Sequence, residues 1–182
     1  MHSHILSVTA VALPSESRIS GMYEKTDLAD AYAIRLPKDA ITDPEQLARF
    51  LFANQAPWVA GLMRVRDALV ACFGIKTAKQ LQTPTASNDG KRIYIFKIHA
   101  ISAHEIVLGE NDKHLDFRLS VLHQRSAAAT GNASYLILST VVHCHNRLGR
   151  TYIMLIAPFH RMIVQSSLRR AARIGWPTVS ST

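Results

Sequence analysis

Three histidines in the last third of the chain have side chains that could do chemistry. His143 and His145 are two residues apart, so on a β-strand they share one face. Two imidazoles on one face can hold a metal ion such as zinc, with His160 or an acid as the third ligand. However, no Asp or Glu follows Asp116 in the chain, so an acidic ligand would have to come from an earlier segment. We therefore assign no metal site and keep His143 and His145 as candidates only.

Two other interpretations of these histidines stay open. His143 and His145 could end a strand at its wet margin and hydrogen-bond to the backbone of a turn. One histidine could also act as a general acid or base near neutral pH, and an enzyme would then use His143, His160 and Tyr94. The chain contains no G-x-S-x-G, P-loop or H-E-x-x-H pattern. We therefore favour a protein that is not an enzyme but leave catalysis open, and we expect no cofactor.

The segment after these histidines has the residue types of a strand-to-helix junction. Asn146 can cap a helix or form a turn, and Gly149 can adopt backbone angles that other residues resist. Arg147 or Arg150 could tie the junction to an acidic residue. The alternative is an anion-binding site, because arginines lie beside the N-terminus of a helix.

The longest helical pattern runs from Arg150 to Arg173 and would form a rod roughly 35 Å long. Tyr152–Ala157 is apolar on every side, which predicts burial all round. From Phe159 onward a single apolar stripe opposes a basic face. Pro158 removes one backbone hydrogen bond and should bend the helix.

The middle of the chain alternates apolar and polar residues as β-strands do. His114–His123 alternates most clearly, which predicts one dry face and one wet face. Tyr135–His145 is apolar on both faces, so we expect it to be central or covered on both sides. The other expected strands are Ala31–Leu36, Ile93–His99 and His104–Leu108.

Two shorter helices are expected after the first strand. Asp43 suits the N-cap and Pro44 the first position of a helix over Glu45–Asn54. Pro57 interrupts the helical pattern, and a second helix is expected over Trp58–Phe73. Helices that are segregated from an antiparallel run of strands favour the α+β class, with the long helix lying across the apolar face of the sheet.

A bent helix over a sheet predicts a cavity between them, and the alternative is a solid core closed by the same side chains. An aromatic body with a polar tip makes Tyr94 the best hydroxyl for orienting a ligand carbonyl. Trp58 would wall the cavity or pack two helices together. The residues expected to bind a ligand are Trp58, Tyr94, Phe96, Phe117, Tyr152, Ile156, Phe159 and His160.

This order of elements resembles the helix-grip fold of the START-like, polyketide-cyclase-like (SRPBCC) superfamily. Three stretches are also similar to an uncharacterised bacterial family, a domain of unknown function, within that superfamily. They are LADAYAIRLP (28–37), APWVAGLMRVRDALVACFGIK (56–76) and HNRLGRTYIMLIAPFHRMIV (145–164). The resemblance implies a curved antiparallel sheet around the C-terminal helix, with an apolar cavity between them. It implies no reaction.

The resemblance and the element pattern define one domain over residues 13–175, with flanking tails at 1–12 and 176–182. Residues 1–12 could be a loose arm or a short edge strand. The first residues contain no Lys or Arg before their apolar tract, which argues against a signal peptide. Two cysteines do not make a disulfide scaffold, and they are typical of buried thiols in a reducing cytoplasm.

The net charge of +8 favours anionic partners, and Arg161, Arg169, Arg170 and Arg173 form the densest basic patch. No Lys/Arg block of the kind used by nucleic-acid-binding arms occurs, and no apolar run reaches the ~20 residues of a transmembrane helix. A homodimer stays open. Three functions remain: a carrier of a small apolar or amphipathic ligand, a cyclase- or dehydratase-type enzyme, and a module that binds a protein or membrane through its basic helix. We expect the first.

Overall fold

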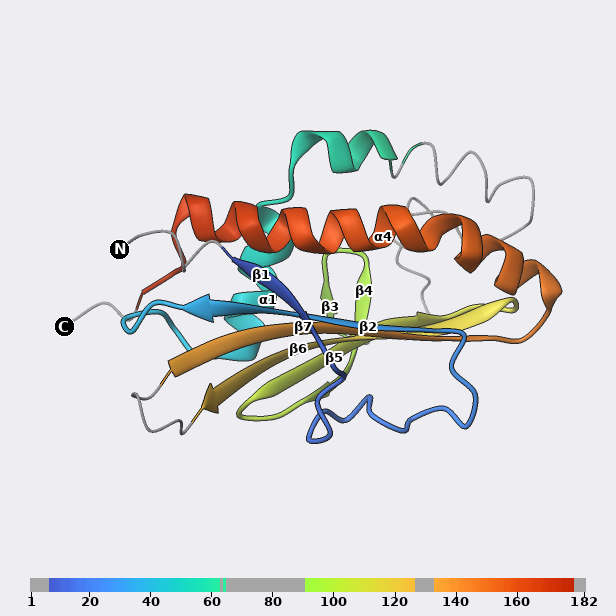
Figure 1. Cartoon of the computed structure of the whole chain (residues 1–182), viewed down its shortest axis with the longest axis horizontal. Coiled ribbons are helices and arrows are strands. Elements are labelled where there is room, and N and C mark those ends of the chain that lie inside the picture. Colours follow the sequence, from blue (N-terminus) through green and yellow to red (C-terminus); the bar gives the residue numbers. More distant parts are fainter. Residues whose placement is uncertain (1–6, 63, 65–90, 127–132, 179–182) are drawn as a thin grey trace.

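A computed structural model describes residues 7–62, 64, 91–126 and 133–178 of the chain (Figure 1). Its strands form one seven-stranded sheet in the order β1-β2-β7-β6-β5-β4-β3, and every neighbouring pair is antiparallel. The strands are β1 (Val8–Val11), β2 (Leu28–Leu36), β3 (Arg92–Ile93), β4 (Phe96–Ile101), β5 (Glu105–Asn111), β6 (Leu115–Ser126) and β7 (Ala133–Cys144). The labelled helices are α1 (Pro44–Ala53) and α4 (Arg147–Ile174). This is an α+β architecture, as the sequence predicted.

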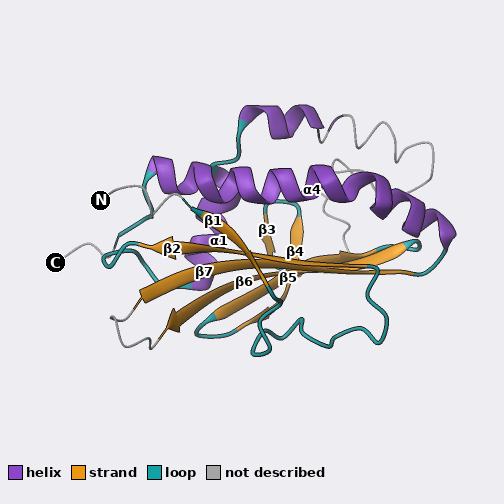
Figure 2. Cartoon of the chain, in the orientation of Figure 1, coloured by secondary structure: helices purple, strands orange, loops and turns teal. Residues whose placement is uncertain are grey.

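The long helix α4 lies across one face of the sheet (Figures 1 and 2). The helix α1 is on the same side and packs against β5, β6 and α4. Leu168 and Ala171 of α4 are buried in the main core with Ile34 of β2, Leu136 of β7 and Leu47 of α1. The amphipathic stripe of α4 therefore forms the core from one side and the apolar face of the sheet forms it from the other.

The sheet is also covered on its second face. The segment of residues 12–27 runs along that side of the sheet (Figure 2). Ile19 in this segment is buried against Val107 of β5 and Val141 of β7. The prediction that this strand is central or covered on both sides is confirmed, because β7 pairs with both β2 and β6.

The predicted wet face of β6 is wrong. Ser120 and Arg118 belong to that face, and both are buried. The reason is the covering segment, which brings the Ser17 hydroxyl to within 2.6 Å of the Glu105 carboxylate. The same carboxylate accepts a 2.6 Å hydrogen bond from Ser120, so polar residues on this face are satisfied by one another rather than by water.

The ends of both helices follow local sequence rules. Asp43 caps α1 by accepting a hydrogen bond from the Gln46 N–H, and Pro44 is at the first helical position. Asn146 caps α4 by accepting from the Gly149 N–H at 3.0 Å. The helix α4 contains Pro158 and is curved in Figure 1, its N-terminal part sloping toward the sheet.

The predicted all-round burial of Tyr152–Ala157 is wrong. Met154 is 75% exposed and Leu155 is 56% exposed. A helix that lies on one face of a sheet can bury only the side that faces the sheet, however apolar its other side is. Within the same stretch, Tyr152, Ile153 and Ala157 do pack against the sheet beside Val142 and Cys144.

The strand expected over Ile93–His99 is divided in two. Ile93 of β3 pairs with Phe96 of β4, so a two-residue turn separates these strands. Tyr94 lies in that turn with φ of 56°, in the left-handed region that side chains disfavour. Tyr94 is therefore a turn residue rather than a strand residue.

Three further segments complete the fold. Val8–Val11, which the sequence left open as an arm or an edge strand, is an edge strand on β2. Trp176, in the expected C-terminal tail, is buried with its ring centroid 5.9 Å from that of Phe50. The second predicted helix is helical over residues 57–62 and at 64, and the rest of its range lies outside the described residues.

Candidate functional site

A cavity of about 230 Å³ lies between α4 and the sheet. Its wall is mainly apolar and aromatic, and Phe96 is central to it. The Phe96 ring meets Phe52 at 5.3 Å and Phe117 at 5.7 Å between centroids, both edge to face. The strained turn residue Tyr94 adds a third contact at 6.5 Å. These rings come from the end of α1, from the β3–β4 hairpin and from β6, which the fold brings together.

Six of the eight residues expected to bind a ligand line this cavity. They are Tyr94, Phe96, Phe117, Tyr152, Ile156 and His160. The other two, Trp58 and Phe159, do not line it and are 40% and 43% exposed. Phe159 follows Pro158 on the side of α4 turned away from the sheet, and Trp58 lines a groove on the outer surface. The alternative of a fully solid core is wrong.

The lining residue His160 has an acidic partner that the sequence pattern did not predict. Asp30 of β2 places its Oδ1 atom 3.3 Å from Nε2 of His160, and the Arg161 Nε is 3.7 Å from Asp30 Oδ2. Thr140, which pairs with Asp30 across β2 and β7, is buried and lines the cavity. The sequence pattern could have indicated Asp30, because on a strand it shares the apolar face of Leu28 and Tyr32.

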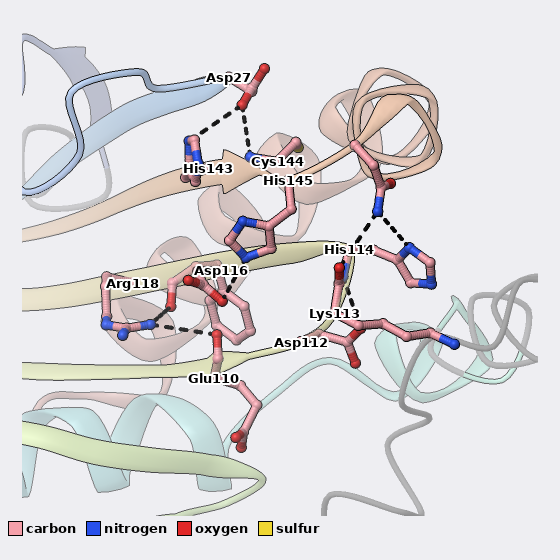
Figure 3. Close-up of polar contacts among 12 residues, drawn as sticks. Asp27, Glu110, Asp112, Lys113, His114, Asp116, Arg118, His143, Cys144 and His145 are labelled. Carbon is pink, nitrogen blue, oxygen red and sulfur yellow. Dashed lines mark hydrogen bonds and ion pairs between the residues drawn. The ribbon is translucent and has the colours of Figure 1, made fainter.

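His143 and His145 are on the other side of the sheet from His160. The His143 Nδ1 donates to the Lys25 carbonyl at 2.7 Å, and its ring stacks on Tyr23 with centroids 5.5 Å apart. The His145 Nε2 is 3.2 Å from Asp116 (Figure 3). The acid partners come from earlier segments, as the sequence required. Burial raises the pKa of Tyr23, while the nearby Arg118 opposes that shift and Asp116 adds to it.

This arrangement bears on two alternatives that the sequence left open. His160 cannot complete a metal site with His143 and His145, because the sheet lies between them. Across the described ranges, no three His, Cys, Asp or Glu side chains are grouped closely enough to hold a metal ion. The three residues named for the case of an enzyme are also apart, since Tyr94 and His160 line the cavity while His143 packs on Tyr23.

The strand-to-helix junction is held by structural contacts. The Asn146 amide reaches Nδ1 of His114 at 3.0 Å, and the His145 N–H donates to the His114 carbonyl at 2.9 Å. A Cβ on Gly149 would come within 2.3 Å of the His114 oxygen, so only glycine fits there. The Arg150 Nε lies 3.3 Å from Asp27, which confirms the interpretation that an arginine ties this junction to an acid.

Asp27 also binds the backbone of the last strand. Its Oδ2 accepts a 2.7 Å hydrogen bond from the Cys144 N–H (Figure 3). Burial, with a smaller contribution from the Asp27 charge, raises the pKa of the Cys144 thiol to about 11. This thiol is therefore protonated and unreactive at neutral pH, which matches its expected place in the core.

A second hollow, about 750 Å³ in volume, lies on the outer side of α4. Residues 56–58 form one wall, and the four arginines of the basic patch contribute to the other. The Arg170 Nε donates to the Asn54 carbonyl at 3.0 Å, and Arg169 bonds Gln165 within the helix. No acidic residue occurs anywhere in α4. The hollow is therefore basic, with Trp58 as its aromatic component.

The fold and the cavity define a class of protein: an open antiparallel sheet with a long C-terminal helix across one face and an apolar space between them. A family model described as "Protein of unknown function (DUF2867)" matches residues 22–167, so this chain belongs to that family. This confirms the resemblance to a family of unknown function. No curated protein and no solved structure matches the chain. Among the described helices, none combines the length and apolarity needed to traverse a bilayer.

Proposed function

We propose that this protein binds a small hydrophobic or amphipathic molecule in the cavity between the sheet and α4. The observation that carries the proposal is the aromatic wall built around Phe96 and Phe117. A volume of about 230 Å³ exceeds the ~150 Å³ of an apolar cavity large enough for benzene. Ligand sites are mostly apolar with a few fixed polar groups, and this cavity has that composition.

The proposal includes a fold of the helix-grip type, in a single domain related to the START-like superfamily. A sheet that carries a long C-terminal helix over a cavity supports this assignment. It also includes a bacterial, cytoplasmic protein. The buried thiol of Cys144 supports the cytoplasmic location, because unpaired buried cysteines are typical of reducing compartments.

The test is native mass spectrometry of the freshly purified full chain, followed by extraction of the denatured protein. We expect an organic adduct that is released on unfolding. The variant Ile156→Trp fills the cavity from α4 and should lose the adduct, whereas Met154→Trp adds the same ring on the exposed side of α4 and should keep it. An adduct that survives Ile156→Trp, or an apo protein that also fails to bind added 1-octanol, would contradict the proposal.

A second candidate function is docking to an anionic phospholipid surface through the outer side of α4. The specific observation is a basic hollow with Trp58, Met162 and Ile174 exposed around it and no acid in the helix. Arginines combined with apolar side chains suit the interface of an anionic membrane. Charge complementarity is the argument for this occupant over an uncharged surface.

Vesicle co-sedimentation tests this second candidate. The full chain should sediment with phosphatidylglycerol vesicles and not with phosphatidylcholine vesicles, and binding should weaken as salt rises. The variant Arg169→Gln/Arg173→Gln should reduce binding, while Arg49→Gln on α1 removes a positive charge that does not line the hollow and should not reduce it. Equal binding by all three proteins would rule the surface out.

A further inference from the structure

The mainly apolar wall of the cavity includes His160 together with the acids Glu110 and Asp112, and His160 also contacts Asp30, which is not itself a lining residue. The Asp30 side chain is only 10% exposed and projects from β2 toward α4. Its Oδ1 is 3.3 Å from His160 Nε2, while its buried Oδ2 has no hydrogen bond among the described residues. The Arg161 Nε, 3.7 Å away, balances the charge of the carboxylate without a hydrogen bond to it.

This contact fixes the roles of the two ring nitrogens of His160. An ionised carboxylate only accepts hydrogen bonds, so the hydrogen of a neutral His160 ring is on Nε2. The lone pair is then on Nδ1. No hydrogen-bond partner of Nδ1 is found in the described parts of the chain. His160 lines the cavity, so its ring offers an acceptor to a molecule bound there.

We propose that His160, positioned by Asp30, is the polar anchor of the cavity and accepts a hydrogen bond from the hydroxyl group of a neutral amphipathic alcohol. This inference rests on the proposed function and adds the class of ligand. The apolar part of the alcohol lies against Phe96 and Phe117, and Thr140 borders the anchor. A hydrocarbon would offer the ring nitrogen no hydrogen-bond donor.

The same charges disfavour a carboxylate ligand. The acids Glu110 and Asp112 line the cavity, and Asp30 beside His160 has Arg161 as its nearby positive charge. A further carboxylate in this space would lack a counter-charge, and an unpaired buried charge is strongly unfavourable. A neutral hydroxyl adds no charge, so the site selects a fatty or aromatic alcohol over the corresponding acid.

The test is calorimetric titration of the full chain with 1-octanol and with its isomer 1-methoxyheptane. The two molecules have the same atoms and similar size, but only the alcohol can donate a hydrogen bond. We expect the alcohol to bind about tenfold more tightly, which corresponds to roughly one net hydrogen bond. Equal affinities for the two isomers would overturn the anchor while leaving the cavity function intact. Failure of both to bind would contradict the proposed function itself.

Two variants separate a ligand anchor from a structural tie between α4 and the sheet. His160→Phe keeps a ring in the wall and removes the acceptor, so both isomers should bind with similar affinity. Asp30→Asn removes the carboxylate that fixes the tautomer and should weaken the preference for the alcohol. A purely structural pair would lower thermal stability in both variants and leave the ratio of the two affinities at its wild-type value.

Discussion

At Gly149 the backbone of α4 passes so close to the preceding strands that no side chain fits. The Cβ of an alanine would lie 2.3 Å from the His114 carbonyl oxygen. Helix propensity alone predicts that Gly149→Ala gains about 1 kcal/mol, and the backbone clash predicts a loss of about 1–3 kcal/mol. We expect the loss, measured as the free energy of unfolding in urea. Gly61→Ala is the control, because nothing lies within 4 Å of its Cβ and it should be neutral or stabilising.

Glu105 is a buried carboxylate with donors on all sides. It accepts from the hydroxyls of Ser17 and Ser120, both at 2.6 Å, and from the Arg18 N–H at 3.0 Å. Glu105→Gln replaces one acceptor oxygen with an amide that meets another donor, so unfolding free energy should fall by about 2–3 kcal/mol. Glu45 is only partly buried, and Glu45→Gln, which disrupts an ion pair with Arg49, should lose about 0.5 kcal/mol or less. Equal losses would contradict the buried network.

Protonation of His123 should destabilise the fold at acid pH. Burial lowers the pKa of His123, and the charges of Arg125 and His104 lower it further. The unfolded chain therefore binds a proton at this residue more readily than the folded chain does. Its contribution to stability is complete above the ordinary histidine value of about 6.5 and is lost as the pH falls through the lower pKa of the folded state.

Chemical denaturation across this range checks the prediction. The urea midpoint of the wild type should fall as the pH is lowered below about 6.5. His123→Gln removes the titrating group, and its amide can still reach the Ser134 hydroxyl that His123 contacts at 2.6 Å. The variant should therefore show a smaller fall. Parallel pH profiles for the two proteins would show that His123 is not responsible.

At the scale of elements, the start of α4 is fixed by more than a helix cap. Asn146 accepts from the Gly149 N–H, as a cap does, and its amide also reaches Nδ1 of His114. Asn146→Ala should therefore lower the free energy of unfolding by about 2 kcal/mol, against about 1 kcal/mol for the simple cap Asp43→Ala of α1. Thermal and urea unfolding measure both. A cost for Asn146→Ala no larger than that for Asp43→Ala would show that the link to His114 contributes little.

At the scale of the whole molecule, the sheet is covered on one face by helices and on the other by a segment without helix or strand. Ile19 closes that second face and is fully buried against Val107 and Val141. Ile19→Ala should destabilise the protein by about 2–5 kcal/mol, while the exposed Met22→Ala in the same segment should change little. If Ile19→Ala unfolds at the wild-type urea concentration, this segment is not part of the cooperative core.

The local elements were predicted well because their causes are local. Asp43 with Pro44 predicted the start of α1, and Asn146 was identified as a cap or turn residue before α4. Strand positions came from alternation, which a pleated strand imposes on any sequence with one buried face. The division of Ile93–His99 was missed because a tyrosine in the left-handed turn position is rare, and nothing in its neighbours indicated it.

The candidate site was predicted in part. Aromatic residues on elements that face one another were expected to meet, and six of the eight do line one cavity. Asp30 was missed because it is far from His160 in the chain, and only the pairing of β2 with β7 beneath α4 brings the two together. The grouping of His143 and His145 with His160 is not found for the same reason, because the sheet separates residues that are near one another in the sequence.

By itself the sequence determined the class of fold, the elements and their caps, and the apolar character of the space beneath α4. These depend on residue spacing and on backbone rules that act over a few positions. Only the tertiary structure decided which face of β6 is covered, which histidine meets an acid, and which side of an apolar helix stays exposed. Those outcomes depend on strand order and on which segments cover the sheet, and both are set by contacts between residues far apart in the chain.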